Sequence, residues 1–351
     1  MPIITKLIVL ATTKFSIMDM YGMGVEMEGG KPGWNDAMNG LPALFGSEMP
    51  SAYELYEIVR FLGAAVDEFP SRVVELPAET SALLEAIDAQ LRLVAAGSLT
   101  DFAYWDKVHD ALEAYRAATE ATFSGNVVAW DASKLGTLTG VLGRMQARMD
   151  VGFERALGFK QDGVVPTYFQ FTCTKYEQTG AASKRGLPLV RVLEFEPHAL
   201  PLFLEGPTRQ LKTLGKKSDA LEVYNAVAVS DLRDKELNMY KISASLADQP
   251  LEIGRMKAFD SGWLENESVW LHMSYKWYLE LLRAGLYEQF YKEITTGVVA
   301  FMEPEVFGRS PLEAASFIVS SAFPDKSLHG SGFLARLSGS TAEFLSMELG
   351  R

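Results

Sequence analysis

The chain has 351 residues, of which 48% are hydrophobic and 22% charged, which is the composition of a globular protein able to bury a sizeable core. Its formal net charge is −12, and this acidic balance argues against nucleic acid and anionic membranes as partners, because both attract basic surfaces. The sequence has no run of about 18 apolar residues, which argues against a membrane-spanning helix.

A single cysteine and four scattered histidines limit the redox and metal chemistry. Cys173 has no second thiol to pair with, so an intrachain disulfide is excluded and a reducing, cytoplasmic location is expected. The histidines form no HxxxH pair, which is the spacing with which helices hold zinc. We therefore expect neither a metal nor an organic cofactor.

A glycine-rich segment at 27–40, MEGGKPGWNDAMNG, is the first candidate for a functional loop. Gly30 followed by Lys31 suggests the phosphate-binding loop of a nucleotide site. A Walker motif also needs a glycine at position 25 and a hydroxyl at position 32, where this chain has Val25 and Pro32. The pattern therefore argues against a nucleotide site.

The same loop holds a tryptophan and a carboxyl group close together. The indole face of Trp34 can stack on a sugar ring, and the carboxyl group of Asp36 can protonate a glycosidic oxygen. The glycines Gly29, Gly30 and Gly33 would let the chain bend both side chains into a sugar site. The alternative is that Asp36 only caps the turn that follows it.

Helical spacing of apolar residues predicts four helices after this loop, over residues 51–69, 79–97, 101–123 and 131–157. The first begins with Ser51 and Glu54 in the S-x-x-E pattern of a capping box, and the second ends at Gly97. The fourth contains several glycines, which weaken it. Residues 1–50 show little periodicity and are expected to be loops with short elements.

The pattern changes near residue 163. Alternation of apolar and polar residues predicts strands at 164–178, 187–196 and 237–246. Cys173 lies on the apolar side of the first strand, where it is expected to be buried. Helical spacing then predicts four more helices, at 267–285, 287–302, 311–323 and 340–351. The sequence therefore indicates a mainly α fold with a small antiparallel β insertion at about 163–250.

Four blocks of the sequence resemble glycoside hydrolase family 94, the inverting glycoside phosphorylases that include cellobiose phosphorylase. GKPGWNDAMNG at 30–40 is similar to the family's DWNDGMN motif. GWLENESVWLHMSYKW at 262–277 has the family's glycine, Glu-Asn pair and histidine in order. FMEPEVFGRS at 301–310 and FLARLSGSTAEF at 333–344 resemble two later segments. The sequences of these blocks resemble a divergent group of large bacterial proteins described as cellobiose-phosphorylase-like more than they resemble cellobiose phosphorylase itself.

The resemblance implies an (α/α)6 barrel of the six-hairpin glycosidase type. In the family this barrel follows an N-terminal β-sandwich, and the loop with the tryptophan and the acid falls near the middle of the barrel. Here that loop lies near residue 34. The resemblance therefore implies that residues 1–351 form an incomplete catalytic barrel, the C-terminal part of a longer protein that lacks the sandwich and the first barrel helices.

The resemblance also implies roles for individual residues. Asp36 is expected to be the general acid that protonates the departing sugar oxygen. The expected sugar-binding residues are Trp34, Asn35, Glu265, Asn266 and Glu303. The expected phosphate-binding residues are His272, Gly339 and the hydroxyl of Ser340 or Thr341.

Such a site would catalyse inverting phosphorolysis, in which a β-glucoside and inorganic phosphate give α-glucose 1-phosphate and a shortened sugar. Phosphate is already an anionic nucleophile, so the enzyme needs an acid but no base. An inverting hydrolase is one alternative, and it would need a second carboxylate about 6.5–9.5 Å from Asp36, for which Glu303 is the candidate. A catalytically inactive fragment or carbohydrate-binding remnant is the other alternative, because part of the barrel would be missing.

The expected partners follow from this function. They are a β-glucoside or oligosaccharide, with inorganic phosphate as co-substrate rather than cofactor. A homodimer is also expected, because relatives in the family are often dimers.

Overall fold

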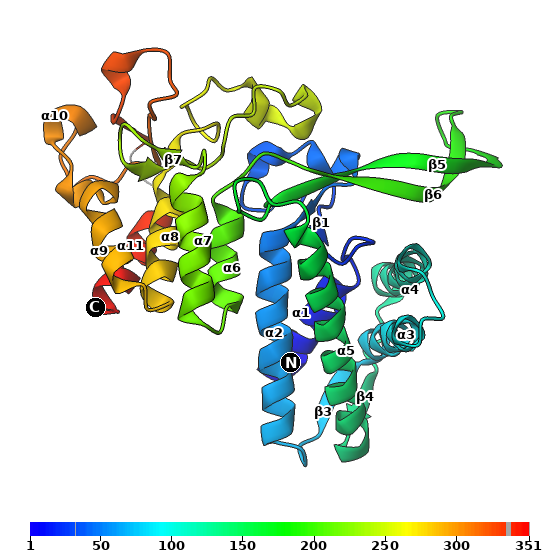
Figure 1. Ribbon diagram of the computed structural model, residues 1–351. Helices are drawn as coiled ribbons and strands as arrows, with labels where there is room; N and C mark the ends of the chain where they lie inside the picture. The colour runs from blue at the N-terminus through cyan, green and yellow to red at the C-terminus, as the bar shows by residue number, and fades with distance from the viewer. Residues whose placement is uncertain (32, 335–337, 351) are drawn as a thin grey trace. The chain divides into compact units, whose positions relative to one another are not determined.

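The computed structural model describes residues 1–31, 33–334 and 338–350. Over these residues the chain is mainly α-helical with small antiparallel sheets, as the sequence predicts (Figure 1). The chain forms two compact units. The first unit comprises residues 1–26, 47–158 and 171–197, and the second comprises residues 27–46, 159–170 and 198–351.

The first unit is built from five helices and short strands. Its described helices are α1 (Ile3–Phe15), α2 (Met49–Glu68), α3 (Ala78–Ala95), α4 (Asp101–Thr122) and α5 (Ala132–Leu157). Its short strands are β1 (Val25–Glu26), β2 (Ser47–Glu48), β3 (Val74–Pro77) and β4 (Val127–Trp130), which pair as β1 with β2 and β3 with β4. Helix α2 packs along α5, and α3 along α4 (Figure 1). The apolar faces of these helices share one core.

All four helices predicted between residues 51 and 157 are present. Helix α5 continues through its glycines because one face, including Leu138 and Met145, is completely buried. The predicted capping box at the start of α2 is wrong. The helix begins at Met49, because Pro50 fits the first turn, where its missing N–H is not needed. Ser51 is therefore inside the helix, and its hydroxyl donates a hydrogen bond to the carboxylate of Glu48.

A buried carboxyl group organises the turn before β1. Asp19 is only 3% exposed, and its Oδ1 accepts hydrogen bonds from the backbone N–H groups of Tyr21 and Met23, both at 3.0 Å. Its Oδ2 accepts from the N–H of Gly24 and from the hydroxyl of Ser47, both at 2.7 Å. One side chain thus joins the turn to strand β2.

A long hairpin follows, formed by β5 (Tyr168–Ala182) and β6 (Pro188–Ala199) (Figure 1). It completes a sheet of order β1-β2-β5-β6, so two of the three predicted strands are confirmed. Cys173 is partly exposed, so its predicted burial is wrong. The reason is that β5 is exposed on both faces beyond this point, over residues 174–182, where apolar alternation no longer reports a core.

The second unit contains a group of helices and several two-residue strands. Its described helices are α6 (Glu205–Thr213), α7 (Lys217–Val229), α8 (Leu271–Arg283), α9 (Tyr287–Gly297), α10 (Pro304–Phe307) and α11 (Ser338–Leu349). Its strands are β7 (Arg233–Asp234), β8 (Met239–Tyr240), β9 (Val269–Trp270), β10 (Phe317–Ile318) and β11 (Gly332–Phe333). Helix α8 packs against α6, α9 and α11, and almost all of its side chains are buried in the core (Figure 1).

Two predictions of secondary structure in the second unit are wrong, and for a third the predicted first residue of the helix is wrong. Residues 311–323 form no helix, because Phe317 and Ile318 pair with β9 and β11 in a three-stranded sheet. The predicted strand at 237–246 shrinks to β8, because its other residues form turns and isolated backbone bonds. Helix α8 begins at Leu271, four residues later than predicted, because Val269 and Trp270 belong to β9.

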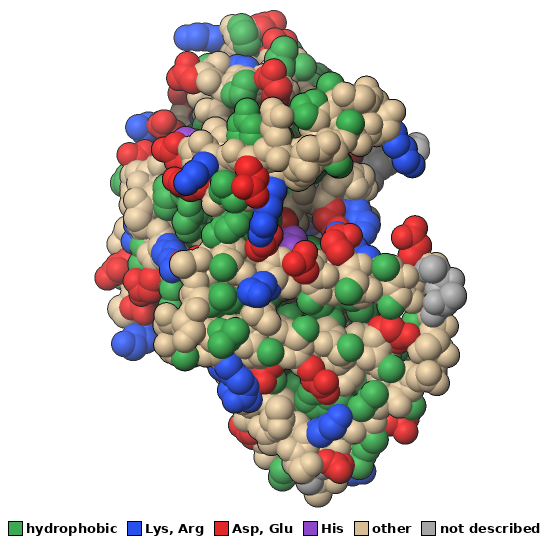
Figure 2. Space-filling model, turned by 90° about the vertical axis from the view of Figure 1, so that its right-hand side faces the viewer, with side chains coloured by type: hydrophobic (Ala, Val, Ile, Leu, Met, Phe, Trp, Pro, Cys, Tyr) green, Lys and Arg blue, Asp and Glu red, His purple; other side chains and the backbone are tan. Residues whose placement is uncertain are grey.

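Figure 2 displays one face of the molecule, on which the described Lys and Arg side chains are interspersed with Asp and Glu. Within the described ranges, every helix is too short or too polar to cross a bilayer.

Candidate functional site

Every residue that the sequence analysis assigns to the site belongs to the second unit. The tryptophan–acid loop comes from residues 27–46, and the remaining candidates come from residues 265–341. Gly30 and Gly33 have φ angles of +77° and +78°, a conformation in which only glycine is unstrained. These two glycines turn the chain so that Trp34 packs against the core of the unit and Asn35 is buried.

The loop after Trp34 packs closely on residues 251–258. The short 3-10 helices η1 (Asp36–Met38) and η2 (Leu41–Leu44) lie against η3 (Leu251–Ile253) and η4 (Arg255–Ala258). The N–H of Gly40 donates to the carbonyl oxygen of Ile253 at 3.2 Å, and the N–H of Arg255 donates to Oδ1 of Asn39 at 3.1 Å. A Cβ atom on Gly40 would overlap the carbonyl group of Glu252. This contact brings Arg255 beside Asp36.

Asp36 lies in an ion pair. Its Oδ1 accepts a hydrogen bond from Nη2 of Arg255 at 2.6 Å, across 219 residues of chain, and the hydrogen bond raises the pKa of Arg255. The Asp36 side chain is 60% exposed, so a ligand can reach it. The carboxyl group therefore bonds to a distant side chain, which does not favour the alternative that it only caps the local turn.

Glu265 lies in a tight turn whose electrostatics are coupled to this ion pair. Positive φ angles at Gly262, Leu264 and Glu267 form the turn, and the backbone of Trp263 pairs with that of Asn266. Partial burial raises the pKa of the Glu265 carboxyl, and the negative charge of Asp36 raises it further, while Arg255 lowers it. Asp36, Arg255 and Glu265 thus form one cluster of interacting charges.

Two buried amides stand next to these acids in the sequence. Asn35 and Asn266 are 2% and 5% exposed. The Nδ2 of Asn266 donates to the carbonyl oxygen of Phe259 at 2.7 Å, which fixes the turn that carries Glu265. The Oδ1 atom of each asparagine is buried and has no hydrogen-bond partner among the described residues, so each leaves an acceptor unused by the described protein atoms.

Trp34 connects the loop to helices α6 and α8. Its Nε1 donates a hydrogen bond to the carboxylate of Glu205, the first residue of α6. Its ring meets the ring of His272 edge to face, with centroids 5.7 Å apart and planes at 85°. His272 lies in the first turn of α8, so the predicted sugar platform and the predicted phosphate ligand are in contact.

His272 is neutral near neutral pH. Its partial burial lowers its pKa to about 4, and the positive charges of Lys276 and Arg209 add to this effect. Arg209 follows Glu205 by one turn of α6, with Nε 3.6 Å from Oε1 of Glu205. Lys276 follows His272 by one turn of α8, with Nζ 3.9 Å from Oε1 of Glu343 in α11.

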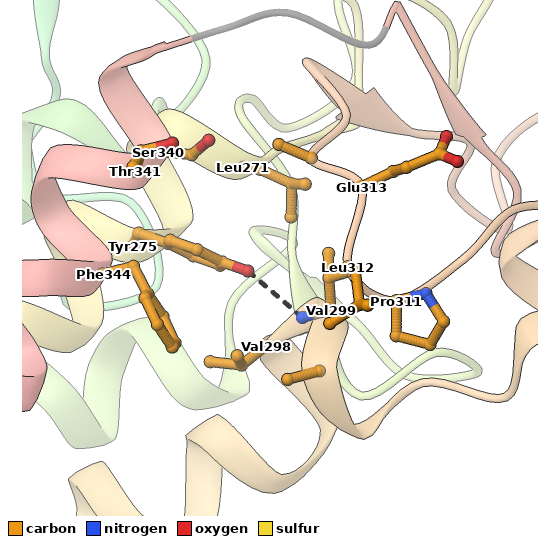
Figure 3. Close-up of a pocket in the computed structure, with 12 residues that line it drawn as sticks. Leu271, Tyr275, Val298, Val299, Pro311, Leu312, Glu313, Ser340, Thr341 and Phe344 are labelled. Carbon is orange, nitrogen blue, oxygen red and sulfur yellow. Dashed lines mark hydrogen bonds between the residues drawn. The ribbon is translucent and has the colours of Figure 1, made fainter.

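Ser340 and Thr341 line a pocket of about 260 Å³ (Figure 3). The two hydroxyls come from the first turn of α11, and Leu271 and Tyr275 come from α8. Most of the lining is apolar, and its charged side chain is a carboxylate, Glu313. Among its described lining residues this pocket has hydroxyl donors but no Lys or Arg side chain, whereas phosphate sites use both kinds of donor. Gly339 lies in the same first turn of α11.

The two parts of the predicted phosphate site lie at the same end of neighbouring helices. Lys276 contacts Glu343, and the rings of Tyr275 and Phe344 are 6.4 Å apart, so the middle of α8 faces the middle of α11. Residue 282, at the end of α8, lies beside residue 350, just after α11. The helices therefore run parallel, and His272 and Ser340 are both in first turns.

Glu303 is separate from these contacts. It is exposed, and its backbone forms the N-cap of α10, where its carbonyl oxygen accepts from the N–H groups of Val306 and Phe307 at 3.0 Å. It takes part in none of the side-chain contacts described above. The structure thus brings together the sequence-predicted residues of the loop, of 265–266 and at His272, but not Glu303.

Comparison of the sequence with protein-family models and with curated proteins finds no match. The site is therefore interpreted from its own residues. It has two chemically different ends on either side of Trp34. One end has Asp36, Arg255, Glu265 and the two asparagines, and is rich in hydrogen-bond acceptors. The other has His272, Arg209 and Lys276, and is rich in donors.

Sequence reasoning missed Glu205, Arg209, Arg255 and Lys276. Glu205 and Arg209 are four residues apart, as are His272 and Lys276, so each pair lies on one helix face. This spacing could have drawn attention to Glu205, Arg209 and Lys276. No comparable signal exists for Arg255. It reaches Asp36 only through the close packing at Gly40.

Proposed function

We propose that the protein is an inverting glycoside phosphorylase that cleaves a β-glucoside with inorganic phosphate, giving α-glucose 1-phosphate and a shortened sugar. The observation that carries this proposal is the position of Trp34. Its ring meets His272, which has Arg209 and Lys276 nearby, and two residues along the chain Asp36 offers an accessible carboxyl group. An apolar ring face between an acid and a basic group suits a sugar held between a proton donor and a phosphate.

In the proposed reaction Asp36 is the general acid. Its carboxyl group gives a proton to the glycosidic oxygen as the bond between that oxygen and C1 breaks. A phosphate oxygen attacks C1 from the opposite face and forms the new C1–O bond, which inverts the configuration. In the structure Asp36 is paired with Arg255, so in the proposed reaction it takes up a proton from solvent before each turnover and returns to this pair once the proton has been transferred. Glu265, Asn35 and Asn266 would bind sugar hydroxyls.

The resemblance to glycoside hydrolase family 94 belongs to the same proposal. The four blocks place the proton donor, the histidine and the hydroxyl-bearing turn in the family's order. On this basis the mainly α fold is proposed to be of the (α/α)6 barrel type. A homodimer and a cytoplasmic location are part of the proposal as well.

An inverting hydrolase is the second candidate, and one observation favours it. Glu265 is a second carboxyl group whose pKa is raised, in part by the charge of Asp36. It is therefore a better second carboxylate than the exposed Glu303. In a hydrolase Glu265 would act as the acid and Asp36 as the base that activates water.

Phosphate dependence separates these functions. The protein is incubated with cello-oligosaccharides and with β-1,3-glucosides, with and without phosphate, and glucose 1-phosphate and free glucose are quantified. A phosphorylase forms glucose 1-phosphate only when phosphate is present, and Asp36→Asn abolishes it. Free glucose formed at the same rate without phosphate would instead identify a hydrolase. No turnover by either protein would identify an inactive sugar-binding remnant.

A further inference from the structure

We infer that a pocket in the first unit binds a small amphipathic carboxylate, with the acyl chain in the apolar interior and the carboxylate on Arg72. The pocket is lined by α1, α2, α5, β3 and the turn between α2 and β3, and it has a volume of about 450 Å³. Small-molecule sites commonly measure about 300–1,000 Å³, so this volume suits such a ligand. This α2–β3 pocket shares no residue with the proposed glycoside site, which belongs to the second unit.

The α2–β3 pocket has a buried apolar floor and an exposed apolar rim. Val66, Val74 and Leu135 line the floor and are 6%, 7% and 2% exposed. Phe69 and Val73 line the rim and are 51% and 58% exposed, although both side chains are large and apolar. Removing apolar surface from water is favourable by about 25 cal/mol per Å², so a ligand with an apolar chain gains free energy by covering both parts.

Backbone hydrogen bonds and helix packing fix the walls of the pocket. Helix α1 contacts both α2 and β3, and α2 packs along α5 (Figure 1). The hydroxyl of Thr5 in α1 donates to the carbonyl oxygen of Glu75 in β3 at 2.9 Å. The N–H of Phe69 donates to the carbonyl oxygen of Ala65, and the N–H of Arg72 donates to that of Phe69, both at 3.1 Å. These bonds close the turn that carries Phe69 and Arg72 at the rim.

Arg72 determines which kind of ligand fits. Among the described lining residues it carries the one polar side chain, and the others are Ile, Ala, Val, Leu and Phe. Its guanidinium takes part in no hydrogen bond or ion pair with the residues that the structure describes. A guanidinium matches a carboxylate, because its N–H groups form a fork that both carboxylate oxygens can accept. With no hydroxyl or amide side chain in the described lining to bind further polar groups, the ligand has one anionic end and an apolar body.

Calorimetric titration of the full chain with hexanoate, octanoate and octan-1-ol tests the two parts of the pocket separately. Each CH₂ group that enters the pocket should tighten binding about fourfold, so octanoate should bind about fifteenfold more tightly than hexanoate. Arg72→Gln should weaken octanoate binding about fivefold, the effect of losing one exposed ion pair, and leave octan-1-ol binding unchanged. Arg185→Gln is the matched control, because Arg185 is also exposed and without a side-chain partner among the described residues, but lies in the turn between β5 and β6. It should bind octanoate like the wild type.

Filling the pocket gives a second, independent test. Ala65 lines the pocket, so Ala65→Phe should abolish the binding of octanoate and octan-1-ol, whereas Ala64→Phe, at an exposed neighbour that does not line it, should leave both unchanged. Circular dichroism and thermal unfolding check that each variant is folded. No octanoate binding by the wild type, or equal octanoate binding by Arg72→Gln or Ala65→Phe, would overturn the inference. Self-association of the wild type that Ala65→Phe abolishes, without octanoate binding, would assign the pocket to a second copy of the chain and overturn it too.

Discussion

Replacing Gly40 by alanine is expected to disturb the site without removing any functional side chain. Gly40 lies where the tryptophan–acid loop meets residues 251–258. A Cβ atom there would lie 2.8 Å from the carbonyl carbon of Glu252 and 2.9 Å from the nitrogen of Gly254. Non-bonded carbon atoms prefer about 3.5–4.0 Å, and the Glu252 carbonyl oxygen would lie closer still, so the two backbones must separate by more than about 1 Å.

The cost of this separation follows from what it breaks. Overpacking of this kind costs about 1–3 kcal/mol, and backbone atoms cannot rotate away as a side chain could. Moving the loop also weakens the hydrogen bond from Gly40 to Ile253, worth about 1 kcal/mol. We therefore expect Gly40→Ala to lower the free energy of unfolding of the second unit by about 2–4 kcal/mol. It should also move Asp36 relative to Arg255 and reduce turnover.

Gly29→Ala is the matched control, because a Cβ atom on Gly29 has no neighbour within 4 Å in the described structure and its φ angle is not positive. Urea unfolding gives the free energy of each variant, and the glucoside assay gives its activity. We expect Gly29→Ala to match the wild type in both. If Gly40→Ala is as stable and as active as Gly29→Ala, the close packing of these loops does not build the site.

Three further predictions concern individual side chains. Asp36→Asn should abolish phosphorolysis while calorimetry shows unchanged phosphate binding. Loss of both would contradict the separation of the acid at Asp36 from the phosphate-binding end at His272. His272 has a pKa of about 4 in the folded protein, below its ordinary value, so the wild type should lose stability as pH falls from 6.5 towards 4. His272→Gln should lack this pH-dependent loss of stability, which is about 1 kcal/mol because the ring is partly exposed. If the free energies of unfolding of the two proteins changed in parallel with pH, the prediction would be refuted. Asp19→Asn should destabilise the first unit by about 2–4 kcal/mol in urea, because its amide cannot accept from both Gly24 and Ser47; a change below about 0.5 kcal/mol would contradict that role.

The helical spacing of apolar residues predicted the helices well where these residues are buried in the structure. Helices α3, α4 and α5 follow their apolar spacing, and Thr100 and Asp131 cap α4 and α5 through their side chains. The pattern failed where distant segments determine the structure. The segment 311–323 has the apolar spacing of a helix, yet Phe317 belongs to strand β10, which pairs with β9 and β11. The rings of Phe317 and Trp270 stack with their centroids 5.9 Å apart.

Individual residues of the site could be predicted from the sequence, but the contacts that bring them together could not. The motifs drew attention to Trp34, Asp36, Glu265 and His272, and the structure brings the loop into contact with α8. The ion pair of Asp36 with Arg255 could not be predicted, because it depends on a contact between backbones far apart in the chain. The exposed position of Glu303 was equally beyond reach, since sequence similarity carries no information on burial.

The central claim is that phosphate, and not water, attacks the sugar that Asp36 protonates. Phosphorus NMR of a reaction containing the full chain, a β-glucoside and inorganic phosphate tests it directly. We predict a resonance of α-glucose 1-phosphate that grows with time in the wild type and is absent for Asp36→Asn. Glucose release with no phosphate ester, or the same ester signal in both proteins, would contradict the account.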